Sequence, residues 1–232
     1  MRLVLFVSLF FFSFSCFSQV FDRSITVGVS PLYSYRNLRN GDGSQSVSNV
    51  IASRNSYEEP LLSYGIFVGY NHKISKRFSL GGELKYQRLG FRTDIKLDSL
   101  RPRQPNDPLI PTSIEFDDIF HISSLYINNY YTFLKKENSD VYAVGGLGMD
   151  VLLDHYIKRK TDKTSQVPDL AFEGKQINVS AKLGLGAIYK LNDHSAISTS
   201  LGYHLNILDF NTNPVRLRLV YFGLNIGYVI SL

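Results

Sequence analysis

Five ionisable residues occupy positions where the surrounding sequence alternates between small polar and large apolar side chains. They are Glu83, Lys85, Asp150, Lys182 and His204. Alternate side chains of a β-strand point to opposite faces, so these five belong to the polar faces of their segments. Enclosed together, they could relay protons or ions, or fill an interior as a hydrogen-bonded cluster. We expect the structural role, with Asp150 and Lys182 pairing across neighbouring strands, because each buried charge needs a partner.

Serine, histidine and acidic residues near the segment ends could instead form the triad of a hydrolase that acts on lipid or peptide. The candidates are His121 with Ser123 or Ser124, Asp154 with His155, and Asp209. The chain has five histidines, so such neighbours arise readily, and we predict no catalytic residues and no enzyme activity. Two adjacent ligands at 154–155 make a weak metal site, and residues 146–148 lack the third glycine of a dinucleotide fingerprint. We therefore predict no metal and no cofactor.

The N-terminus has the pattern of a secretory signal. Arg2 precedes an apolar stretch over residues 3–17, and Ser18 is a small residue at the cleavage position. We predict that residues 1–18 are removed and that residues 19–232 form one domain. A lipoprotein signal cleaved directly before Cys16, or a retained anchor, is the alternative. No later stretch approaches the roughly 20 apolar residues of a membrane-spanning helix. The single cysteine cannot form a disulfide within the chain.

The densest positive cluster in the chain lies in the second half of the sequence. It consists of Lys158, Arg159, Lys160 and Lys163, and the formal net charge of the whole chain is +5. An exported protein rarely meets nucleic acid, so we predict no nucleic-acid partner. An anionic membrane surface is the better counterpart. The hypothesis is that these four residues contact lipopolysaccharide phosphates from an extracellular loop, and the alternative is an ordinary solvated loop.

The elements that would position these residues are strands, because apolar side chains recur with period two. In residues 24–36, Val27 and Val29 share one face, while Gly28 and Ser30 share the other. The same alternation recurs in eight segments: 24–36, 63–70, 78–92, 120–133, 141–153, 176–191, 196–207 and 218–232. This number and spacing predict an all-β fold, an eight-stranded antiparallel up-and-down transmembrane β-barrel.

The connections between these segments alternate in length. Long ones span 37–62, 93–119 and 154–175, short ones span 71–77, 134–140 and 192–195, and 208–217 is intermediate. Short periplasmic turns and long extracellular loops are typical of outer-membrane barrels. Because the number of strands is even, we expect both chain ends in the periplasm. Residues 37–62 are rich in Asn, Ser and Gly, so we expect a mobile loop there.

Three features favour lipid over water on the apolar face. The opposite face is small and carries few charges, aromatic residues gather near the strand ends, and an apolar ladder runs to Leu232. A soluble, lipocalin-like barrel in the periplasm is the alternative. With lipid outside, Leu183→Arg should cost about 2–4 kcal/mol near the middle of the membrane, and Lys182→Gln should cost less.

Three parts of the sequence together suggest a family. The hairpin at 70–86, the glycine-rich strand at 145–148 and the apolar C-terminal strand resemble the PorT family, the porin-family outer-membrane β-barrels of Bacteroidota-type bacteria. The resemblance extends over residues 20–232. It implies a barrel in the outer membrane of a Gram-negative bacterium and carries no catalytic signature.

We therefore expect a monomeric outer-membrane barrel with a structural or interaction role. Its extracellular loops would present side chains to outer-membrane lipid, to lipopolysaccharide or to envelope protein partners, since loops on a rigid barrel can vary without disturbing assembly. The first alternative is a small pore or carrier for a hydrophobic or ionic solute. The second is a hydrolase with its site at the barrel rim.

Overall fold

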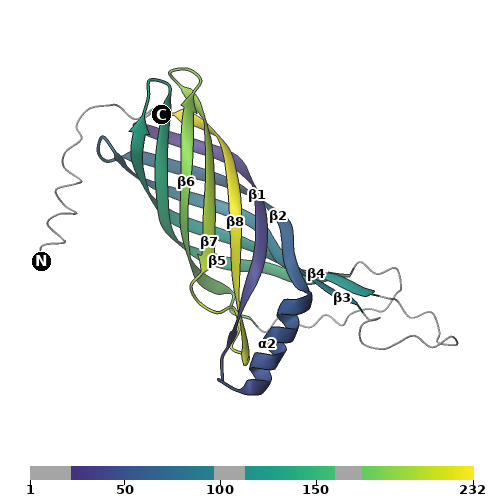
Figure 1. Ribbon diagram of the computed structural model, residues 1–232. Coiled ribbons are helices and arrows are strands. Elements are labelled where there is room, and N and C mark those ends of the chain that lie inside the picture. Colours follow the sequence, from purple (N-terminus) through teal and green to yellow (C-terminus); the bar gives the residue numbers. More distant parts are fainter. Residues whose placement is uncertain (1–21, 97–112, 160–173) are drawn as a thin grey trace, which may run out of the picture.

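The alternating segments form eight antiparallel strands that close into a single barrel (Figure 1). The computed structural model describes residues 22–96, 113–159 and 174–232. The strands are β1 (Arg23–Asn40), β2 (Glu58–Lys73), β3 (Phe78–Lys96), β4 (Ser113–Lys135), β5 (Ser139–Arg159), β6 (Ile177–Lys190), β7 (Ser195–Asn206) and β8 (Val215–Ser231). Each pairs with its neighbours in sequence, and β1 pairs with β8 to close the ring. The predicted fold class is confirmed.

Apolar positions face outward all around the ring. Val27 lies opposite Val68 of β2 and Tyr228 of β8, and residues directly opposite each other share a face of the sheet. Leu183 and Lys182 show how the outward and inward faces differ. Leu183 is 70% exposed, whereas Lys182 is 5% exposed. An apolar surface of this extent is not stable in water and calls for an apolar environment.

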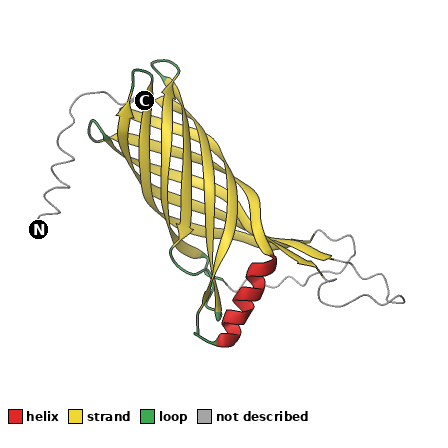
Figure 2. Ribbon diagram, in the orientation of Figure 1, coloured by secondary structure: helices red, strands yellow, loops and turns green. Residues whose placement is uncertain are grey.

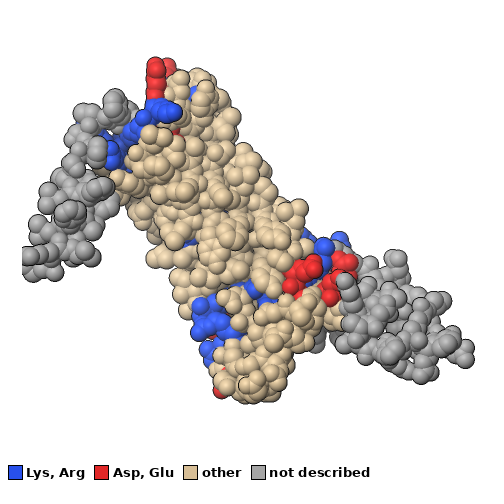
Figure 3. All heavy atoms as spheres, viewed as in Figure 1, with Lys and Arg blue, Asp and Glu red and all other residues tan. Residues whose placement is uncertain are grey.

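The outer surface is divided into bands along the barrel axis. Figure 3 shows charged side chains gathered near the two ends of the visible face, with few between them. Exposed aromatic side chains flank the apolar band, among them Tyr33 and Phe222 toward one end and Tyr189 and Tyr228 toward the other. An apolar band between aromatic girdles is the exterior of barrels that stand in a bilayer.

The two ends of the barrel differ in their connections. Short turns at 74–77, 136–138 and 191–194 lie at the end where β1 begins and β8 finishes, as the sequence predicted (Figure 2). At the other end, β3, β4 and β5 run further than predicted. Their ladder continues through charged residues, with Arg92 opposite Asp117, so the apolar alternation that marks a half-buried strand is lost there.

The mobile loop expected at 37–62 is not what the structure contains. Instead it holds helix α2 (Gln45–Tyr57) between longer strands β1 and β2. The Ser44 side chain caps the helix by accepting a hydrogen bond from the Val47 N–H at 3.3 Å. The Asn40 carboxamide organises the preceding turn, where Gly43 has a positive φ of 75°. No helix in the described ranges is long and apolar enough to cross a membrane.

Candidate functional site

The five ionisable residues singled out in the sequence all lie inside the barrel. Glu83, Lys85, Asp150, Lys182 and His204 are each at most 7% exposed. They come from β3, β5, β6 and β7, and the barrel closure brings these strands around one interior. In an eight-stranded barrel this space is just wide enough for side chains to fill it.

An ion pair across the interior joins β6 to β3. Lys182 Nζ lies 2.8 Å from Glu83 Oε2, and it also lies 4.9 Å from the centre of the Tyr126 ring. The pairing of Lys182 with Asp150 expected from the sequence does not form. The strand register places Lys182 opposite Gly146, four residues along β5 from Asp150, which is about 13 Å in an extended strand.

The remaining interior charges have polar partners. Asn206 Nδ2 donates to Asp150 Oδ2 at 2.6 Å, and Lys85 Nζ donates to Asn225 Oδ1 at 3.2 Å. Each buried charge is therefore compensated by a hydrogen bond or by an opposite charge, as burial in a low-dielectric interior requires.

His204 is held by aromatic rings. It stacks on Tyr221 with ring centroids 4.3 Å apart and meets the edge of the Tyr126 ring at 5.7 Å. The hydroxyls of Tyr126 and Tyr221 are 3.1 Å apart, and Ser180 Oγ donates to the Tyr126 hydroxyl at 3.0 Å. Neither ring nitrogen of His204 has a hydrogen-bond partner among the described residues.

A small cavity lies beside this cluster, toward the short-turn end. Its volume is about 60 Å³, and Glu83, Lys182, His204, Tyr142 and Asn225 contribute to its lining. The space is enough for a few water molecules. Glu83 Oε1 and the ring nitrogens of His204 are buried here without partners among the described residues, so they are the polar atoms that such waters would satisfy.

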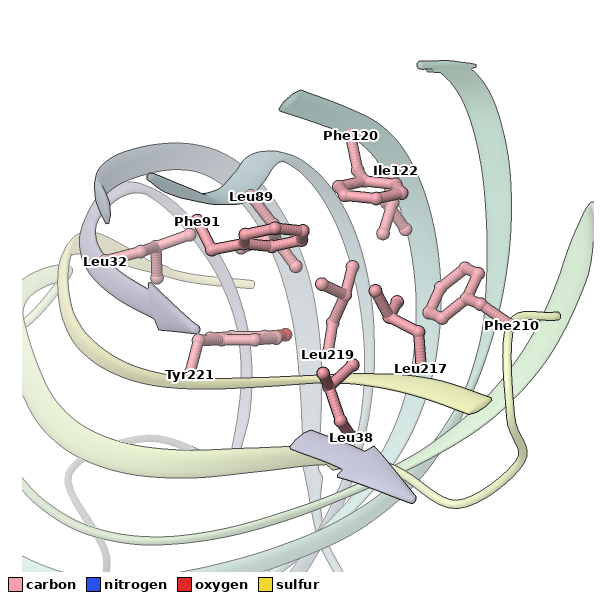
Figure 4. Close-up of a cluster of buried hydrophobic side chains, with 10 residues drawn as sticks. All are labelled: Leu32, Leu38, Leu89, Phe91, Phe120, Ile122, Phe210, Leu217, Leu219 and Tyr221. Atoms are coloured by element: carbon pink, nitrogen blue, oxygen red, sulfur yellow. The ribbon is translucent and has the colours of Figure 1, made fainter. Parts of the chain in front are cut away.

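Apolar side chains gather in the other half of the interior, beside buried polar residues such as Ser34 and Arg36. Ten buried side chains converge in it (Figure 4), and we call them the apolar plug: Leu32, Leu38, Leu89, Phe91, Phe120, Ile122, Phe210, Leu217, Leu219 and Tyr221. Phe120 is central, with ring centroids 6.3 Å from Phe91 and 6.2 Å from Phe210. The plug lies in the half of the barrel nearest α2, whereas the cavity, lined also by Ser24 and Asn71, lies toward the short turns.

Helix α2 is clamped to the barrel above the plug. Arg36 is buried, its guanidinium contacts the carboxylate of Glu58, and its Nη1 donates to Asn55 Oδ1 at 2.7 Å. Ile51 of α2 packs against the plug, and Val47 is buried. The helix therefore covers the interior rather than extending freely from the rim.

The residues considered for a hydrolase contact different partners at different places in the barrel. His121 lies on the opposite face of β4 from Ser124, with its Nδ1 against the Tyr86 hydroxyl. Ser124 points into the barrel and accepts a hydrogen bond from Gln87 Nε2 at 3.0 Å. His155 Nε2 lies 3.2 Å from Asp118 Oδ1. Within the described ranges, no cluster of three or more potential metal ligands occurs.

Only two of the four residues of the predicted basic cluster lie in the part of the chain that the structure describes. Lys158 and Arg159 belong to the end of β5, whereas a loop was predicted there, and Lys158 lies opposite the acidic Asp117 of β4. Lys160 and Lys163 lie outside the described residues, as do the predicted signal at 1–18 and Cys16.

A different basic group, which the sequence analysis missed, gathers at the α2 end of β1 and β8. We call Arg39, Arg216 and Arg218 the arginine rim. Arg218 Nε donates to Asp209 Oδ1 at 2.6 Å, and Nη1 atoms of Arg39 and Arg216 lie 3.7 and 3.6 Å from the same carboxylate. Partial burial would raise the pKa of Asp209, but the hydrogen bond from Arg218 and the three guanidinium charges together lower it below its usual value.

The closed ring, the apolar exterior and the filled interior define a β-barrel of the membrane-spanning class. No family model matches the sequence, and comparison with curated proteins found no match. The resemblance to the PorT family therefore stays a prediction.

The chain is similar to solved outer-membrane proteins. Neisserial surface protein A (NspA) is 10% identical with a TM-score of 0.49, over 91% of this chain and 97% of that chain. The outer membrane protein OprG from Pseudomonas aeruginosa is 12% identical with a TM-score of 0.45, over 93% and 98%. The outer membrane protease OmpT from Escherichia coli is 7% identical with a TM-score of 0.47, over 94% and 99%. Identities this low transfer no activity to this chain.

Proposed function

We propose that this protein is a closed, non-conducting barrel of the bacterial outer membrane that serves as an anchor for an interaction surface at its α2 end. The apolar exterior supports the location, because a closed barrel satisfies every backbone hydrogen bond in lipid. The single observation that carries the non-conducting role is the apolar plug beneath the clamped helix α2.

In the proposed orientation the short turns and both chain ends face the periplasm, and α2 faces the cell exterior. Short periplasmic turns and longer extracellular connections are the usual arrangement in such barrels. A monomer is proposed because the ring closes through β1 and β8 of one chain and needs no second copy for closure. The partner would be an envelope protein or outer-membrane lipid that meets the α2 end.

A binding role accounts for the site better than a pore or a hydrolase does. A pore needs a continuous aqueous path, and ten buried apolar side chains in the part of the interior nearest α2 argue against one. A hydrolase needs a nucleophile activated by a neighbouring base, whereas the buried Ser124 hydroxyl accepts a hydrogen bond from Gln87 Nε2 and His121 lies on the opposite face.

The orientation is tested by labelling single cysteines in intact cells with a membrane-impermeant maleimide. Gln45→Cys at the exposed start of α2 should react in intact cells, and His194→Cys in a short turn should react only after the outer membrane is permeabilised. The chain without either substitution provides the background. The reverse pattern, or recovery of the protein in the soluble fraction without detergent, would contradict the proposal.

The non-conducting role is tested in planar bilayers. Purified protein should give no current steps, with its folding established by the slower gel migration of the boiled sample compared with the unheated one. Regular single-channel steps from the unsubstituted protein would instead establish a pore.

A further inference from the structure

The arginine rim occupies a defined level on the outer face of the barrel. Arg39 of β1 lies directly opposite Arg216 of β8, and Arg218 lies one step nearer the apolar band. Continuing along the same face, the register next places Tyr35 opposite Val220, and then Tyr33 opposite Phe222. The three guanidinium groups therefore stand immediately beyond the aromatic edge of the apolar band, where lipid headgroups would lie in the proposed orientation.

The charge of this group is only partly balanced. Three guanidinium groups share the single carboxylate of Asp209, and the side chains of Arg39 and Arg216 are 51% and 44% exposed. Like charges directly opposite each other in a sheet repel, so their pairing here costs free energy. Arg216 also donates from Nη2 to the Gly41 carbonyl oxygen at 3.5 Å, which adds no negative charge to the group. A bound anion would supply the missing negative charge and acceptor oxygens.

Arginine is well suited to a phosphate group. Its planar guanidinium donates two parallel hydrogen bonds to phosphate oxygens, and several such groups can surround one phosphate. The exposed rings of Tyr33 and Phe222 continue directly below, and acyl chains could lie along them. Lys158 of the predicted basic cluster, in contrast, faces Asp117 across the strands.

We propose that the arginine rim binds the phosphorylated headgroup of an outer-leaflet glycolipid, with the acyl chains of that lipid along the aromatic edge of β1 and β8. The inference rests on the proposed membrane orientation and adds a ligand class and the residues that hold it.

The test uses the full-length protein purified in mild detergent and titrated with bisphosphorylated lipid A, followed by native mass spectrometry. The double variant Arg39→Gln/Arg216→Gln should bind at least about tenfold more weakly than the unsubstituted protein, since it loses charge-assisted hydrogen bonds. The matched control Lys73→Gln/Lys190→Gln removes the same charge at the short-turn end and should bind normally. Dephosphorylated lipid A should bind the unsubstituted protein as weakly as bisphosphorylated lipid A binds the arginine variant.

Two results would overturn the inference. If the arginine variant and the control bound lipid A equally well, the arginine rim would not be the binding site. If inorganic phosphate bound as tightly as lipid A, the ligand would be a free anion and not a lipid. Slower gel migration after boiling shows that each variant is folded. If the variants are folded in the membrane but lipid binding is unchanged, this inference fails and the proposed function stands. If the unsubstituted protein is not in the membrane, the proposed function itself fails.

Discussion

The two halves of the barrel interior are filled by opposite means. Near α2, the apolar plug brings ten buried side chains from β1, β3, β4, β8 and the connection before β8 into one cluster. Toward the short turns, the Glu83–Lys182 ion pair and the His204 stack surround a cavity of about 60 Å³.

The two halves of the interior therefore depend on different conditions for their stability. An apolar cluster is stable when its volume is filled, so its weak point is a cavity. A buried polar cluster is stable when its charges are matched, so its weak point is an unpaired partner. The plug is therefore sensitive to lost volume, whereas the polar half is sensitive to a lost charge.

The largest expected effect is a cavity in the plug. Phe120→Ala should lower the free energy of unfolding by about 3–5 kcal/mol, because a fully buried ring leaves a void. The matched control is Phe133→Ala on the same strand, where the ring is 48% exposed on the outside. Denaturant unfolding of both variants in lipid vesicles measures the difference. Equal losses would mean that the plug is no better packed than the exterior.

The next effect is an unpaired charge in the polar half. Lys182→Gln should cost about 3–5 kcal/mol, because Glu83 stays buried without its partner. This revises the expectation from the sequence that this substitution would cost less than one on the lipid face. The double variant Glu83→Gln/Lys182→Gln should recover most of the loss in the same unfolding assay. Additive losses in the double variant would show that the two residues do not interact.

A charge on the exterior tests the boundary between inside and outside. Leu183→Arg should cost about 2–4 kcal/mol, since its side chain would stand in hydrocarbon in the proposed orientation. Leu183→Met at the same position is the control and should be close to neutral. Refolding into vesicles measures both. A neutral Leu183→Arg would mean that this face does not meet lipid.

The smallest effect depends on pH at the arginine rim. The pKa of Asp209 is lowered in the folded protein, so its stabilising contribution is full above the unfolded carboxyl value of about 3.9 and is lost as the pH falls through the lower folded value. The unsubstituted protein should therefore be more stable than Asp209→Asn at pH 7, and the gap should close in acid. Unfolding curves at several pH values measure it, and a gap that widens in acid would reverse the assigned sign.

The strands and their two faces could be predicted because alternation is a local property. Leu183 and Lys182 are neighbours in sequence, and period two alone sends one outward and the other inward. The sequence also contains a sign of the plug, because Leu32 and Leu89 are large apolar residues on faces that are otherwise small or polar near the long connections.

Helix α2 was missed because its sequence has no strong helical pattern. A Ser44 cap and the burial of Val47 and Ile51 stabilise it, and the second of these requires the barrel to be in place.

The sequence by itself determined the eight strands, the short turns and which side chains point inward, because each depends on residues close together in the chain. Only the tertiary structure decided that Lys182 pairs with Glu83 and that three arginines surround Asp209. Those contacts join distant strands, and their partners follow from register and closure of the ring, which no local pattern encodes.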